Sequence, residues 1–226
     1  MFDIYPVNPE LERVRAYSVQ KKISFLRTHF EKIENIFNQE LDALSRECVL
    51  EMERTQGDDD DGSYDYRASE AMREIEYVFL RMHRYSAILA IYSYLETSMM
   101  VLCKDAKESL EISICVNDLR GEGIFACKKY LELLAGVDFN KINGTWSNLV
   151  VLNKVRNCIV HADGDANKAR RDDLLNIIGS NRGLSFVEKS LIMVSSDFIF
   201  DAIDDVENIL VYLAETERPK RVSASF

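Results

Sequence analysis

The chain has 226 residues, a length typical of a single domain. Hydrophobic residues make up 47% of it, which is enough for a core and argues against a wholly disordered protein. The formal net charge of −10 argues against a protein that binds nucleic acid over its whole surface.

The five cysteines show no CxxC spacing and form no cluster with histidine. An odd number of unclustered cysteines predicts free thiols and no zinc site. Two acidic segments, 55–63 and 163–174, lack the alternating ligands and closing glutamate of a calcium loop. We therefore expect no metal and no cofactor.

The chain is expected to begin with one long helix. Three prolines and nine glycines are few helix breakers for this length, which favours long helices. Between about residues 13 and 54, apolar residues recur every three or four positions and form one stripe: Ile23, Leu26, Phe30, Ile33, Phe37, Leu41, Leu44 and Cys48. The following segment, 55–63, contains four consecutive aspartates and is expected to be a solvated loop.

A second long helix is predicted for about residues 66–106. Its expected buried stripe contains one carboxylate, Glu96: Ile75, Val78, Met82, Tyr85, Leu89, Tyr92, Glu96, Met99 and Cys103. The opposite face is also apolar from 87 to 95, which predicts a central helix. Glu96 makes the run 87–103 too polar for a comfortable membrane span, and the N-terminus has no signal-peptide pattern. We therefore expect a soluble, cytoplasmic protein that does not bind a membrane.

The remaining elements are shorter. Segment 109–122 is ambiguous between strand and helix before its glycine turn, and the alternation in 183–195 favours a small β-hairpin. Helices are predicted for 123–135, closed by Gly136, and for about 145–161, 166–179 and 196–216, followed by a frayed tail, 217–226. The expected fold is all-α, and the chain is expected to form one domain, 1–226.

The predicted helix 145–161 has two different faces. At 100° per residue, one stripe is apolar and expected in the core: Leu149, Leu152, Val155 and Ile159. The neighbouring flank is mostly polar: Asn153, Arg156, Asn157, Val160 and His161. Cys158 falls on the buried side, so we expect no nucleophilic role for it.

These polar residues suit cleavage of a phosphodiester without metal. A histidine titrates near neutral pH and can exchange a proton with a ribose 2′-OH or a leaving oxygen. An arginine carries a permanent charge and a planar fork that matches phosphate oxygens. An asparagine can orient either group. One histidine cannot easily serve as acid and base on opposite sides of a phosphate, whereas a twofold dimer would supply two.

The motif lies in the most basic part of the chain. Residues 140–182 contain seven basic and four acidic residues, a net charge of +3, which leaves −13 for the remainder. A local patch of this kind can hold a short phosphate segment. The candidate RNA-binding residues are Lys154, Lys168, Arg170 and Arg171. The last three could instead form a solvated helix start.

Arg156, Asn157 and His161 resemble the R-x4-6-H signature of HEPN-domain ribonucleases, in the form where a polar residue follows the arginine. Two long helices, the acidic Glu96 on the central one and the DLRGEGI turn are also similar to the HEPN bundle over about residues 65–215. The resemblance implies an antiparallel helical bundle with its core at about 65–215. It also implies a metal-independent endoribonuclease that acts as a homodimer, often as a toxin or phage-defence effector. Arg156 and His161 would be the catalytic pair, Asn157 would support them, and Glu96 would be an inward acid near the arginine.

Other interpretations remain open. His161 could be only a helix-capping histidine, Arg156 could form a buried ion pair with Glu96, and Asn153 could be an ordinary exposed residue. The domain could be a non-catalytic HEPN-like module that binds a partner protein or a nucleotide. It could also be a toxin subunit that an antitoxin or sensor protein keeps silent. The tyrosine that marks HEPN toxins paired with nucleotidyltransferase antitoxins is absent, because Ala162, Asp163 and Gly164 follow the histidine.

Overall fold

The computed structural model describes residues 9–54, 63–169 and 172–216. It is helical apart from one small two-stranded antiparallel sheet, which confirms the all-α class. The elements in chain order are α1 (Pro9–Arg54), α2 (Ser63–Glu74), the π-helical segment η1 (Ile75–Phe79), α3 (Leu80–Ser109), the 3₁₀-helix η2 (Val116–Asp118), α4 (Gly123–Ala135), the 3₁₀-helix η3 (Phe139–Ile142), α5 (Asn143–Ala162), α6 (Asp172–Ser180), β1 (Leu184–Val187), β2 (Leu191–Val194) and α7 (Ser196–Glu215).

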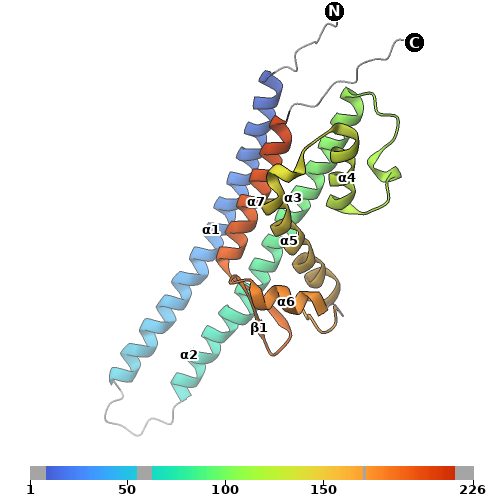
Figure 1. The fold of residues 1–226 in the computed structure, drawn as a ribbon. Coiled ribbons are helices and arrows are strands. Elements are labelled where there is room, and N and C mark those ends of the chain that lie inside the picture. The colour runs from blue at the N-terminus through green and yellow to red at the C-terminus, as the bar shows by residue number, and fades with distance from the viewer. Residues whose placement is uncertain (1–8, 55–62, 170–171, 217–226) are drawn as a thin grey trace, which may run out of the picture.

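Helix α3 lies at the centre of the arrangement. Helices α1 and α7 lie on one side of it, and α4 and α5 lie on the other (Figure 1). Helix α1 and the continuous helix α2–η1–α3 are antiparallel and extend together as a long arm. Helix α7 packs on α1, α3 and α5, so it joins the two sides through one hydrophobic core.

Most predicted elements are confirmed. Helix α1 ends at Arg54, as predicted, and α4 spans the predicted 123–135. Gly136 closes α4 with a φ of 70°, in the left-handed region that glycine adopts readily. The hairpin also forms, and Glu188 and Lys189 take φ values of 51° and 71° in its turn. The predicted tail, 217–226, and nearly all of the predicted acidic loop lie outside the described residues.

The buried stripe predicted for the second helix is wrong in its first half. Val78, Met82 and Leu89 are 39%, 58% and 37% exposed, whereas Tyr85 and Tyr92 are buried. The cause is the π-helical segment η1, whose i→i+5 hydrogen bonds put an extra residue into one turn and rotate the helix that follows. The other buried residues of α3 cover a broader face: Leu80, Ile88, Ile91, Leu95, Met99, Leu102, Cys103 and Ala106.

The helix predicted for 166–179 is also shorter than expected. It begins only at Asp172 and ends at Ser180. Before it, the Asp165 carboxylate accepts hydrogen bonds from the backbone N–H groups of Asn167 (3.0 Å) and Lys168 (3.4 Å). An aspartate that bonds the backbone ahead of it stabilises a turn in place of a helix.

The helix Arg67–Ser109 is long and apolar enough, by length and composition, to cross a membrane. Within the structure, 39% of its most apolar window is buried. Tyr85, Leu95 and Met99 from this helix belong to the hydrophobic core. The cytoplasmic location stays a prediction.

Candidate functional site

Helix α5 has the two faces that the sequence predicts. Leu149, Leu152, Val155 and Ile159 are buried, and Cys158 is only 2% exposed, on the buried side as expected. The neighbouring flank reaches the surface: Asn153, Arg156 and Asn157 are partly buried, and Val160 and His161 are exposed. Arg156, Asn157 and His161, the candidate catalytic residues, are therefore all at least partly accessible to solvent.

Arg156 is held by an aromatic ring and an amide. Its Nη1 donates a hydrogen bond to Oδ1 of Asn157 at 2.9 Å, and its Cζ lies 5.2 Å from the ring centroid of Tyr92 on α3. The guanidinium is attracted to the electron-rich face of the ring. The sequence predicts Tyr92 only as a core residue and does not predict its contact with Arg156.

Asn157 is itself oriented by Asn153. Its Nδ2 donates to Oδ1 of Asn153, one turn earlier, at 3.3 Å. The Asn157 oxygen therefore faces the arginine and its nitrogen faces Asn153, which fixes the direction of the amide. Two hydrogen bonds therefore link Asn153 through Asn157 to the guanidinium of Arg156.

Glu96 does not pair with Arg156: among the described residues, no ion pair within 4.0 Å joins them. The Glu96 carboxylate lies instead against the start of α4, where a Cβ added to Gly123 would stand 2.5 Å from Glu96 Oε1. Gly123 also has a φ of +55°. The first turn of α4 offers a carboxylate the positive end of a helix dipole, which explains an acid at this depth.

Tyr92 lies between these two charges. Burial raises its pKa to about 12, with Glu96 raising it further and Arg156 lowering it. The phenol is therefore neutral near pH 7 and is available as a hydrogen-bonding group rather than as a charge.

The end of α5 is fixed by the β-hairpin. The Gly164 carbonyl accepts a hydrogen bond from Ile192 N–H at 2.9 Å, and the Ile192 carbonyl accepts one from Tyr85 Oη at 2.6 Å. Asp163 has a φ of 51° and Gly164 a φ of +78°, so the chain turns sharply here. These bonds hold the last turn of α5, and hence the backbone of His161, against α3 and β2.

Two of the four predicted RNA-binding residues, Lys154 and Lys168, lie in the described part of the chain. Lys154 is partly buried on α5. Lys168 lies in the turn before α6, and its Nζ is 3.5 Å from Asp165 Oδ2. Arg170 and Arg171 lie outside the described residues. The role of all four in binding RNA stays a prediction.

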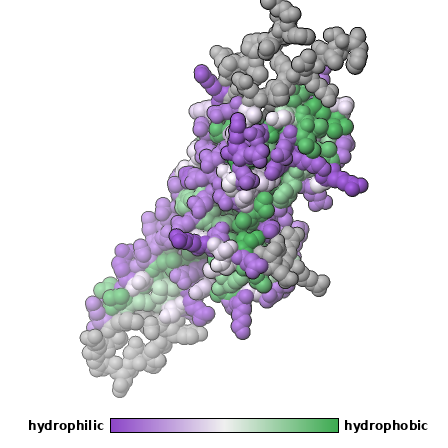
Figure 2. All heavy atoms as spheres, in the orientation of Figure 1, coloured by the Kyte–Doolittle hydropathy of each residue, from purple (hydrophilic) through white to green (hydrophobic). Residues whose placement is uncertain are grey.

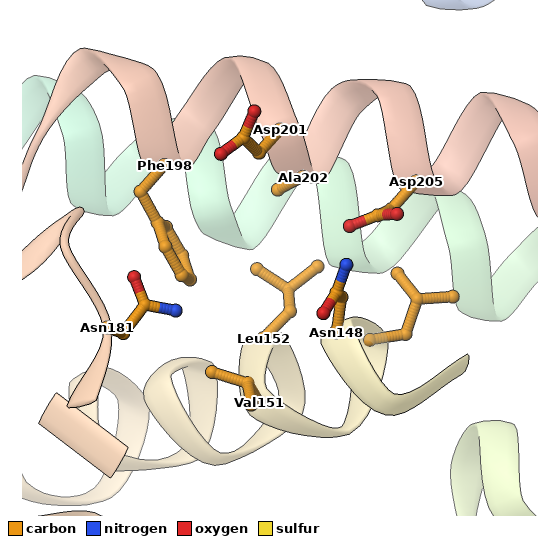
Figure 3. A pocket seen from close by; sticks show the side chains of 9 residues that line it. Asn148, Val151, Leu152, Asn181, Phe198, Asp201, Ala202 and Asp205 are labelled. Carbon is orange, nitrogen blue, oxygen red and sulfur yellow. The ribbon is translucent and has the colours of Figure 1, made fainter. Parts of the chain in front are cut away.

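A pocket of about 100 Å³ lies on another side of α5, facing α7 (Figure 3). The side chains of Asn148 and Asp205 point toward each other there, with Asp201 and Asn181 nearby. Burial raises the pKa of Asp205 to about 6, and Asp201 and Asp204 raise it too, against a lowering by Asn148. An acidic lining of this kind repels phosphate, so this pocket is not the candidate RNA site.

A buried polar cluster that the sequence did not predict joins α1, α3 and β2. Glu34 is 5% exposed and accepts hydrogen bonds from Arg84, whose Nη1 also donates to the Val194 carbonyl at 3.0 Å. His83 lies with its Nε2 3.7 Å from Glu34, and its ring stacks on Phe30 with 4.9 Å between centroids. The sequence does contain an indication that Glu34 is buried, because this residue lies between Phe30 and Phe37 on the buried side of α1. The cluster therefore holds α1, α3 and β2 together.

Comparisons with protein-family models, with curated protein sequences and with solved structures find no match to this chain. Among the described residues, no group of three or more His, Cys, Asp or Glu side chains is placed to hold a metal ion.

Proposed function

We propose that the chain is a HEPN-like endoribonuclease that cleaves RNA without a metal ion. The observation that carries this proposal is the flank of α5, where Arg156 is oriented by Asn157 and Tyr92, and His161 is exposed five residues farther along the same helix. No carboxylate within 4.0 Å neutralises Arg156 among the described residues. We infer that this charge binds a phosphate group of the RNA.

In the proposed reaction, a ribose 2′-OH attacks the adjacent phosphorus. His161 transfers the proton, either from the attacking hydroxyl or to the leaving 5′ oxygen. Arg156 binds the phosphate and stabilises the negative charge that develops on its oxygens. Asn157 and Asn153 keep the guanidinium in place. The products would be a 2′,3′-cyclic phosphate and a 5′-OH end.

A homodimer would complete the site by supplying a second histidine. Tyr92 contacts Arg156 and Tyr85 lies against Gly164. The segment of α3 that contains Leu89 therefore passes beside the end of α5 that contains Val160. These two apolar side chains are 37% and 46% exposed beside the motif. A second copy that covered them would bring two motifs to one cleft about a twofold axis.

The first test is an RNA cleavage assay in EDTA. Purified protein is incubated with total RNA and with tRNA, and the ends of the products are mapped. The proposal expects cyclic phosphate and 5′-OH ends from the wild type. Products with 5′-phosphate ends, or cleavage that EDTA abolishes, would contradict it.

The alternative function is a non-catalytic module that binds a partner protein or a nucleotide. An apolar patch over α4, where Phe125 and Leu133 are 41% and 66% exposed, favours a surface for a protein partner (Figure 2). RNA that stays intact with both the isolated protein and its native complex would favour this alternative. Cleavage by the isolated protein but not by the complex would instead indicate a toxin that an antitoxin or sensor holds silent.

A further inference from the structure

A lysine and a cysteine meet at the end of α3, apart from the proposed site. Lys107 lies in the last turns of α3, and Cys115 lies in the loop that follows. Lys107 Nζ is 2.7 Å from Cys115 Sγ. Both side chains are partly exposed, whereas the other four cysteines are buried.

The loop is built to keep this pair together. The backbone N–H of Ile112 donates to the Lys107 carbonyl at 3.0 Å, which turns the chain back along α3. The backbone N–H of Cys115 donates to Asp118 Oδ2 at 2.7 Å. Tyr130 on α4 donates its hydroxyl to the carbonyl of Ile114 at 3.0 Å. The cysteine therefore has little freedom to move away from the amine.

The distance of 2.7 Å between Lys107 Nζ and Cys115 Sγ is short for a hydrogen bond to sulfur. Bonds from N–H to oxygen are about 2.7 to 3.2 Å long, and sulfur is larger than oxygen. It is also too long for a direct bond, because even the S–S bond between two larger atoms is only about 2.0 Å. A distance between these limits fits two atoms that share one bridging atom.

The pair places an amine beside a sulfur that can be oxidised. The thiolate is the form of a cysteine that peroxide attacks. The hydrogen bond with Cys115 raises the pKa of Lys107. Oxidation of the sulfur removes that thiol, and the amine then loses its proton more easily.

We propose that Lys107 and Cys115 form a covalent N–O–S bridge when the protein meets hydrogen peroxide. The Cys115 thiolate attacks one peroxide molecule, an S–O bond forms, the O–O bond breaks, and after protonation a sulfenic acid and one water result. The Lys107 nitrogen attacks a second peroxide in the same way, which gives a hydroxylamine and a second water. The hydroxylamine oxygen then attacks the sulfenic sulfur, the S–OH bond breaks, and a third water leaves. Sulfur and nitrogen each lose two electrons, and two peroxides are reduced.

The bridge would fix the loop 110–115 to the end of α3, reversibly, because thiols reduce the S–O bond. The same segment leads through η2 to Gly123, which lies against Glu96. This modification site does not rest on the proposed ribonuclease function, and its test does not involve RNA.

The test uses the full chain, treated with hydrogen peroxide and digested with trypsin. Trypsin cuts after Lys107 only while its amine is free, so the bridge should leave peptide 105–120 uncut, heavier by one oxygen and lighter by two hydrogens. Dithiothreitol should restore cleavage after Lys107. Cys115→Ser and Lys107→Arg should abolish the product, and Lys104→Arg, one turn away on the same helix, should not.

Three outcomes would overturn the proposal. One is cleavage after Lys107 with Cys115 oxidised to a sulfinic or sulfonic acid. Another is a sulfenic acid at Cys115 that dimedone traps completely while Lys107 stays unmodified. The third is a peptide lighter by two hydrogens without the added oxygen, which would indicate a direct N–S bond.

Discussion

The guanidinium of Arg156 lies over the ring of Tyr92, with 5.2 Å between Cζ and the ring centroid, and makes no ion pair with the nearby Glu96. The ring orients the arginine without neutralising its charge. The carboxylate of Glu96, on α3, lies against the start of α4. Among the described residues, Arg156 therefore has no carboxylate partner within 4.0 Å, as its proposed role in binding phosphate requires.

Replacing Tyr92 should separate the role of the ring from that of its hydroxyl. Tyr92→Phe keeps the aromatic face and should cleave RNA at close to the wild-type rate. Tyr92→Leu removes it and should slow cleavage about tenfold, since a desolvated cation–π contact contributes about 1 to 2 kcal/mol. Cleavage rates are compared at a temperature where melting curves show both variants folded. Equal rates for Phe and Leu would mean that the ring does not position Arg156.

Gly164→Ala should strongly destabilise the fold. The added Cβ would collide with the buried Tyr85 phenol, and φ at this position is +78°. We expect a loss of about 2 to 4 kcal/mol in the free energy of unfolding, measured with denaturant. Gly144→Ala is the control, because nothing lies within 4 Å of its Cβ in the first turn of α5. A similar loss in both variants would contradict the packing of Tyr85 on the end of α5.

Glu34→Gln should show how much the buried cluster between α1, α3 and β2 stabilises the fold. The change leaves the charge of Arg84 without its buried partner, and we expect a loss of about 3 kcal/mol in unfolding free energy. Glu31→Gln, on the exposed side of the same helix, should change it by less than about 0.5 kcal/mol. If both substitutions are neutral, Glu34 and Arg84 are not a buried pair.

Asp205 should make stability depend on pH. Its pKa in the folded protein is about 6, above the ordinary value of 3.8. Between these values the folded protein holds a proton that the unfolded chain has lost, so the free energy of unfolding falls as pH rises from about 4 to about 6. Asp205→Asn should remove that fall and stabilise the protein at pH 7 by about 1 kcal/mol, a reduced figure because the carboxyl is only partly buried. The exposed Asp42→Asn serves as control, and an unchanged pH profile in Asp205→Asn would disprove the assignment.

Val160→Glu tests the proposed dimer. Because Val160 is exposed beside the motif, a charge there should disfavour a second copy on this face and lower cleavage in parallel. Sedimentation velocity would show the shift from dimer to monomer. Leu133→Glu, on α4, should leave both properties unchanged. A Val160→Glu protein that stays dimeric and active would place any interface elsewhere.

The sequence predicts most of this fold because periodicity is strong in long helices. The buried side of α1, the bounds of α4 and the two faces of α5 follow from spacing and from Gly136. The π-helical segment η1 could not be predicted, because its extra residue per turn is set by packing, and it exposes Val78 and Met82 against expectation. The position of Glu96 depends on α4, an element distant in sequence, and the Arg156–Tyr92 contact likewise depends on how two helices meet.

The most direct test of the central claim is the rate at which His161→Ala cleaves RNA in EDTA, with His29→Ala, an exposed histidine on α1, as the matched control. If the flank of α5 is a ribonuclease site, His161→Ala should lose at least about a hundredfold in rate, and His29→Ala should retain it. A His161→Ala protein that is folded, free of contaminating nuclease and as active as the wild type would contradict the account.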